Sequence, residues 1–167
     1  MNKNVAVTII IFFAVIVGLI WIARPGGKQD KNLANSGSVL SGAFFAEESI
    51  FNFGAISMAA GKVSHSFKFK NTGDSPFSVS KIYTSCMCTT AKLSVGGKKF
   101  GPFGMPGHGF VPKINANVPA GEEGVVEAVF DPNAHGPAGV GKVERVITLE
   151  NSAGAPLEFY FSATVTP

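Results

Sequence analysis

Two cysteines separated by a single residue, Cys86 and Cys88, are the only cysteines of this 167-residue chain. On an extended strand, residues two apart point to the same side, so both sulfur atoms can reach one ligand. Thiolate and thioether ligands suit Cu(I) in particular. A disulfide between the two cysteines is an alternative that needs a bent backbone, and two small buried apolar side chains are another. The spacing therefore leaves a soft-metal site, a disulfide and simple packing open.

Further candidate ligands lie in two segments rich in Gly and Pro, where functional side chains are more common than in regular strands. Met105 and His108 lie in residues 101–109, and His135 follows in the turn after residue 130. Our metal hypothesis is a Cu(I) site on the two cysteines, completed by Met105 or His108, with His135 as a further candidate. The alternative metal is zinc in a tetrahedral site, and its ligand set would be Cys86, Cys88, His108 and His135.

The chain lacks the sequence patterns of several enzyme classes. A CxxC motif at the start of a helix is absent, which argues against a thiol oxidoreductase. The sequence also has no Gly-x-Ser-x-Gly elbow, no phosphate-binding glycine loop before Lys-Ser/Thr and no HExxH motif. The net charge of +3 is small, and the basic residues do not cluster with aromatic ones, which argues against nucleic-acid binding. We therefore predict a protein that is not an enzyme.

An apolar run at residues 5–23 predicts a transmembrane anchor. As a helix it would be about 28 Å long, close to the ~30 Å of a bilayer's hydrocarbon core. Trp21 lies near one end, where aromatic side chains meet the lipid headgroups. A cleaved signal peptide is the alternative, but its apolar core is usually ~7–15 residues long and ends in small residues. The sequence Trp-Ile-Ala-Arg-Pro at residues 21–25 fits such a cleavage site poorly.

Residues 24–48 are predicted to form a flexible linker, because they are rich in Gly, Lys, Asn and Ser and show no sustained apolar period. The positive charges that flank the apolar run do not settle its orientation. Lys3 lies on the amino side, whereas Arg24, Lys28 and Lys31 lie on the other, which leans slightly against export of the carboxyl-terminal part.

From residue 49 onward, apolar and polar residues alternate, as is typical of half-buried antiparallel strands. Within residues 62–70, for example, His65 and Phe67 share an apolar face, and we expect His65 to be a hydrogen-bonded core residue. We predict about seven short strands, at residues 50–56, 62–70, 77–83, 91–93, 124–130, 142–150 and 157–165. Two sheets packed face to face would bury them as a sandwich. Residues 94–119, rich in Gly and Pro, are expected to form a long irregular loop.

Several short motifs follow one another in a distinctive order along this region. They are Phe53-Gly-Ala-Ile56, Gly61, His65-Ser-Phe-Lys-Phe-Lys-Asn-Thr-Gly73, Thr84-Ser-Cys-Met-Cys-Thr89, Pro119-Ala-Gly-Glu122 and Val129-Phe-Asp-Pro132. Over residues 49–165 the order resembles a bacterial envelope family with an Ig-like domain of unknown function, fifteen-seventy-three. The family signature reads Ser-Cys-Gly-Cys-Thr, and Met87, which we expect to be a packing residue, replaces its glycine here.

The resemblance implies an Ig-like β-sandwich and an exported carboxyl-terminal domain, which favours that domain lying outside the cytoplasm. We thus predict a single-pass membrane protein with an extracytoplasmic Ig-like domain at residues 49–167. Its expected role is non-enzymatic binding or scaffolding of another envelope protein. The alternative role is metal handling at the cell surface, with Cu(I) bound at the Cys-x-Cys site.

Overall fold

The computed structural model describes residues 39–41, 43–108 and 111–167. Every described residue belongs to a single compact unit of the chain. The anchor predicted at residues 5–23 and the first part of the predicted linker lie outside the described residues. Within the described ranges, no helix has both the length and the apolar character needed to cross a membrane.

The described residues form eleven β-strands and two short 3₁₀ helices, which confirms the all-β class. In chain order they are β1 (Val39–Ser41), β2 (Phe44–Ala46), β3 (Ile50–Ser57), η1 (Met58–Ala60), β4 (Val63–Asn71), β5 (Phe77–Thr84), β6 (Thr89–Val95), β7 (Lys98–Phe103), β8 (Ala116–Val118), β9 (Glu123–Phe130), η2 (Gly136–Gly139), β10 (Gly141–Asn151) and β11 (Leu157–Thr166).

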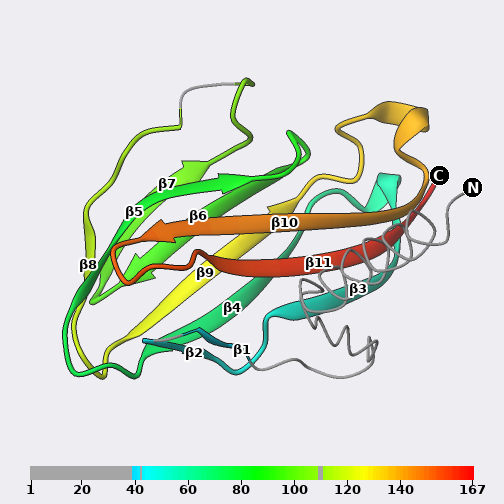
Figure 1. Cartoon of the computed structure of the whole chain (residues 1–167). Coiled ribbons are helices and arrows are strands. Elements are labelled where there is room, and N and C mark those ends of the chain that lie inside the picture. The colour runs from blue at the N-terminus through cyan, green and yellow to red at the C-terminus, as the bar shows by residue number, and fades with distance from the viewer. Residues whose placement is uncertain (1–38, 42, 109–110) are drawn as a thin grey trace, which may run out of the picture. The chain divides into compact units, whose positions relative to one another are not determined.

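The strands form two sheets that lie against each other (Figure 1). One has six strands in the order β1-β2-β4-β9-β6-β7, and the other has five in the order β3-β11-β10-β5-β8. Seven of the connections between the described strands cross from one sheet to the other, and two of them join β5 to β6 and β9 to β10. Thr89 pairs with Phe130, and Thr84 pairs with Ile147, so these two crossovers lie at the same end of the sandwich.

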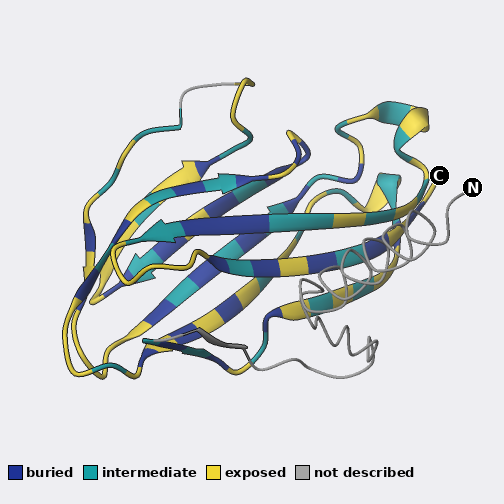
Figure 2. Cartoon of the chain, viewed as in Figure 1, coloured by how far each residue is buried: buried dark blue, intermediate teal, exposed yellow. Residues whose placement is uncertain are grey.

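The core lies between the sheets and is built from alternating residues (Figure 2). In β4, Phe67 and Phe69 are buried while the lysines between and after them are exposed. In β11 every second residue from Leu157 to Val165 is buried, as the alternation predicts. The rings of Phe67 and Phe159 stack across the two sheets with centroids 4.8 Å apart. Burying one such side chain contributes about 1.5–3 kcal/mol.

Four of the eleven strands were not expected from the sequence. β1 and β2 lie inside the predicted linker, and β7 and β8 lie inside the predicted loop at residues 94–119. The linker prediction is therefore wrong for residues 39–41 and 44–46. β1, β2 and β8 have three residues each, too few to show a period of two, whereas β7 contains Gly101 and Pro102, which an edge strand tolerates.

His65 has a polar partner and packs against aromatic rings, as predicted, but it is half-buried and lies outside the fully buried core. Its ring stacks on the ring of Phe51 at a centroid distance of 3.6 Å. Its Nε2 atom lies 2.8 Å from the Glu48 carboxylate. His65 is therefore a packing residue with a polar partner.

Candidate metal and disulfide site

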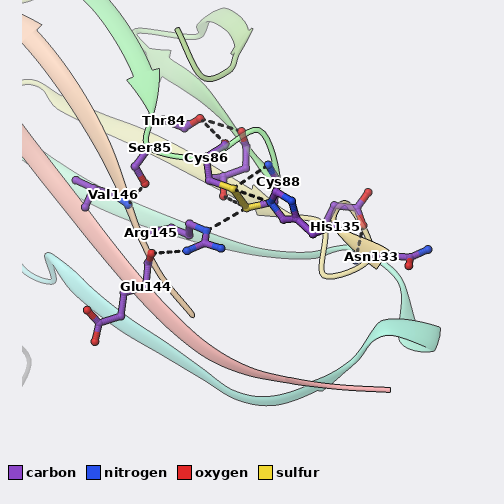
Figure 3. Close-up of a disulfide and its surroundings, with 11 residues drawn as sticks. Thr84, Ser85, Cys86, Cys88, Asn133, His135, Glu144, Arg145 and Val146 are labelled. Atoms are coloured by element: carbon purple, nitrogen blue, oxygen red, sulfur yellow. Dashed lines mark hydrogen bonds between the residues drawn. A yellow bond between two sulfur atoms is a disulfide. The ribbon is translucent and has the colours of Figure 1, made fainter. Parts of the chain in front are cut away.

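Cys86, Met87 and Cys88 lie in the crossover that joins β5 to β6. The crossover is a tight turn, because the Thr89 amide donates a hydrogen bond to the Cys86 carbonyl over 3.1 Å. The Thr84 hydroxyl lies 3.0 Å from the carbonyl oxygens of Cys86 and Thr89 and can donate to either (Figure 3). Local hydrogen bonds thus fix this turn at both ends.

The two cysteines form a disulfide, one of the arrangements that the sequence left open (Figure 3). Their Cα atoms are 5.2 Å apart. The sulfur atoms converge as predicted, but the expected reason is wrong: the turn brings them together, whereas the prediction relied on an extended strand. Cys86 retains 9% of its accessible surface and Cys88 retains 2%.

Met87 stands at the tip of this turn and is 49% exposed. The expectation that it would be a packing residue is therefore wrong. Met87 is exposed, whereas the cysteines on either side of it are buried.

His135 lies in the crossover between β9 and β10. Its Nε2 atom lies 3.2 Å from Cys86 Sγ. The two crossovers are tied together, because the Asp131 amide donates to the Cys88 carbonyl over 2.8 Å. Asp131 also shapes its own turn, since its carboxylate accepts a hydrogen bond from the Asn133 amide over 3.0 Å. The ligand atoms of Cys86, Cys88 and His135 all lie within 4.8 Å of one another.

Arg145 approaches the disulfide from β10, on the side opposite His135 in the close-up (Figure 3). Its Nε atom donates to Cys88 Sγ over 3.1 Å, and its Nη1 atom donates to the Glu144 carbonyl over 2.8 Å. Partial burial lowers the pKa of the Arg145 guanidinium from its ordinary value, yet an arginine stays charged at neutral pH. A fixed positive charge therefore faces Cys88.

The backbone explains why Arg145 reaches the turn. β10 pairs with β5 only from Ile147 onward, so its first residues have no β5 neighbour. The Cys-x-Cys turn takes that place: Ser85 and Val146 exchange two hydrogen bonds of 2.9 Å, one from each amide.

Met105 and His108 lie in the segment between β7 and β8. The His108 amide donates to the Met105 carbonyl over 3.3 Å, and the His108 side chain is exposed. Among the described residues, the group of ligand atoms around the sulfurs contains His135 and not His108. Participation of Met105 or His108 in metal binding stays a prediction.

Sequence reasoning missed Arg145. One signal was available, the choice of arginine over lysine. Arg145 is the only arginine in residues 25–167, which contain eleven lysines. Nothing in the sequence, however, connects it with a turn almost sixty residues earlier.

Residues 44–98 match the family model described as "Protein of unknown function (DUF1573)". The family resemblance is confirmed over these residues. The matched segment includes Cys86 and Cys88 and runs from β2 to the start of β7. No curated protein matches the sequence.

Solved structures with a similar fold share little sequence with this chain. A protein of unknown function from Porphyromonas gingivalis W83 is 11% identical with a TM-score of 0.53, covering 75% of this chain and 50% of that one. The ASH/PapD-like domain 7 of human CEP192 is 14% identical with a TM-score of 0.45, covering 82% and 95%. The Vibrio cholerae VesB protease is 18% identical with a TM-score of 0.45, covering 71% and 30%.

This chain thus spans half of the Porphyromonas protein and less than a third of VesB. At these identities the likeness concerns the fold alone. It carries no information about activity.

The chemistry of the site depends on its redox state. As a disulfide, the two sulfurs are bonded to each other and cannot act as thiolate ligands. After two-electron reduction they become two thiols beside an imidazole, a donor set that suits soft metals. The residues present therefore fit either a redox couple or a metal site in its reduced form.

Proposed function

We propose that this chain is a membrane-anchored, extracytoplasmic Ig-like protein that binds Cu(I) through Cys86, Cys88 and His135 once the disulfide is reduced. The observation that supports this proposal is the 3.2 Å approach of His135 Nε2 to Cys86 Sγ, which joins ligands from two crossovers. The closeness of all three ligand atoms gives the cysteine pair a nitrogen partner without rearrangement of the strands.

Copper(I) fits this donor set better than zinc does. Two sulfur ligands favour a soft monovalent ion. A structural zinc site needs four ligands, and the group in the described part of the chain contains three. Uptake is coupled to reduction, because the sulfur–sulfur bond must break before either sulfur can bind a metal.

The test is a Cu(I) titration of the reduced full chain without oxygen, in competition with a chromophoric Cu(I) chelator of micromolar affinity. We expect one tightly bound Cu(I) per chain. We expect His135→Ala to weaken binding by more than about tenfold, since even a residue that only orients a metal ligand contributes about that much.

His108→Ala is the matched control, because it removes an exposed histidine that lies outside the cysteine group. It should leave the affinity unchanged. Failure of the wild-type chain to compete with the chelator would contradict the proposal. Loss of binding in His108→Ala but not in His135→Ala would favour the ligand set first predicted from the sequence.

Anchoring by residues 5–23 and an extracytoplasmic location are parts of this proposal that rest on the sequence alone. They can be tested in intact cells with a membrane-impermeant maleimide after reduction of the disulfide. Labelling of the cysteines in a chain that fractionates with membranes is expected. Labelling only after cell lysis, or recovery of the chain in the soluble fraction, would contradict this part.

A binding or scaffolding role, without catalysis, stays a prediction. In its favour, β3 and β7 are terminal strands of the sheets formed by the described residues, and edge strands can pair with a partner strand. Binding of an envelope partner that survives replacement of both cysteines by serine would support such a role independently of copper.

A further inference from the structure

We propose that the Cys86–Cys88 disulfide also oxidises dithiols, with Cys86 as the sulfur that is attacked and Arg145 stabilising Cys88 as it departs. This is a different activity of the same two sulfurs. It does not depend on copper binding, because it starts from the oxidised form and needs no metal.

The surroundings of the two sulfurs are unequal. Cys88 is 2% exposed, and its Sγ atom accepts a hydrogen bond from Arg145 Nε over 3.1 Å. Cys86 is 9% exposed, lies beside the exposed His135, and its Sγ atom accepts a hydrogen bond from the uncharged Cys88 amide over 3.3 Å. Arg145 is the only arginine among the described residues. No second guanidinium therefore lies near Cys86 in this part of the chain.

This inequality sets the direction of exchange. A thiolate attacks one sulfur of a disulfide and expels the other. Approach from solvent reaches Cys86 more easily, and the expelled sulfur is then Cys88. The negative charge that develops on Cys88 faces the Arg145 guanidinium, and a charge-assisted hydrogen bond stabilises such a thiolate.

The exchange has two steps. In the first, a substrate thiolate bonds to Cys86 Sγ, the Cys86–Cys88 bond breaks, and its electron pair leaves with Cys88 as a thiolate. In the second, the other thiolate of the same substrate attacks the substrate sulfur in this mixed disulfide and releases Cys86. The substrate becomes a disulfide after losing two electrons, and the two cysteines gain those electrons.

A purely structural role explains the disulfide less well. A cross-link stabilises a fold chiefly by closing a long loop in the unfolded chain, and this one closes a very short loop. The turn is already fixed by the hydrogen bonds of Thr84 and Thr89. The cross-link therefore constrains little that these bonds do not.

The first experiment measures reduction of the oxidised full chain in metal-free buffer containing a chelator. Dihydrolipoamide serves as a small dithiol, and reduced, unfolded ribonuclease A serves as a protein dithiol. We expect Arg145→Gln to slow reduction about tenfold, the size of effect expected when one charge-assisted hydrogen bond to the leaving sulfur is lost. Arg145→Lys should recover part of the rate.

Lys142→Gln is the matched control, because it removes an exposed cation from the same strand three residues earlier. It should leave the rate unchanged. An equal rate in wild type and Arg145→Gln, or an equal slowing by Lys142→Gln, would overturn the role of Arg145. Faster reaction with ribonuclease A than with dihydrolipoamide would identify protein dithiols as the preferred source.

The second experiment uses wild-type protein alone, so it holds even if the arginine variants fail to fold. The oxidised chain reacts briefly with glutathione, the freed thiol is alkylated with N-ethylmaleimide, and the adducts are located by peptide mass spectrometry. We expect glutathione on Cys86 and the alkyl group on Cys88. The opposite pattern, or an even mixture, would overturn the proposed direction. Neither experiment involves copper, so either result is independent of the Cu(I) titration.

Discussion

At the scale of single residues, the candidate site depends on a few side chains that approach from different segments. Cys86 and Cys88 meet through one turn, His135 approaches from a second turn, and Arg145 approaches from a strand. Each sulfur thus has its own polar neighbour. This division gives the two cysteines different surroundings although a single residue separates them.

A second single-residue requirement lies in the core, at Gly124. A Cβ atom added to Gly124 would collide with the ring of Phe69, which faces it in the β4–β9 pair. We expect Gly124→Ala to lower the free energy of unfolding by about 1–3 kcal/mol, as overpacking does. Urea denaturation measures the loss.

Gly104→Ala provides the control, because a Cβ there would meet no atom within 4 Å and the backbone is not left-handed. It should be close to neutral. Equal stability of the Gly124 variant and wild type would show that the Phe69 ring can move aside.

Three residues of the candidate site could be named from the sequence, whereas the arginine that contacts Cys88 could not. Cys86 and Cys88 stood out because they are the only cysteines, and His135 was named as a candidate. Arg145 could not be found, since it reaches Cys88 only because β10 extends past the end of β5. Such long-range register leaves no mark in a single sequence.

At the scale of elements, β2 is one of two short strands that come before the domain boundary expected at residue 49. Phe44 is buried, and its ring centroid lies 4.0 Å from that of Phe77 in β5, which belongs to the opposite sheet. We expect Phe44→Ala to cost about 3–5 kcal/mol of stability, as is usual for deletion of a buried ring. Thermal or urea unfolding checks this expectation.

Phe45→Ala is the matched control, because Phe45 is the neighbouring ring on the more exposed face of β2. Its loss should be much smaller. If both substitutions had equally small effects, β2 would not be an integral part of the domain, and the boundary at residue 49 expected from the sequence would be favoured.

Strands were predictable where alternation is long enough to recognise. β4, β10 and β11 have nine or more residues each, and their positions follow the predictions closely. β1, β2 and β8 have three residues each and carry no readable period. Their pairing is decided by neighbouring strands, which the local sequence does not encode.

At the scale of the whole described domain, two crossovers at one end of the sandwich supply the candidate site. The Cys-x-Cys turn links β5 to β6, the His135 turn links β9 to β10, and the Asp131 amide joins the two turns. The sequence predicted the sandwich class, but the strand order that brings these two turns together followed only from the structure. The sandwich therefore brings the side chains of the candidate site together at the ends of strands from both sheets.

The most direct test is X-ray absorption spectroscopy of the reduced, Cu(I)-loaded chain prepared without oxygen. The account predicts a copper ion bound by two sulfur atoms and one imidazole nitrogen, with the imidazole signal lost in His135→Ala and retained in His108→Ala. A copper ion without sulfur neighbours, or an imidazole signal that persists in His135→Ala, would contradict it.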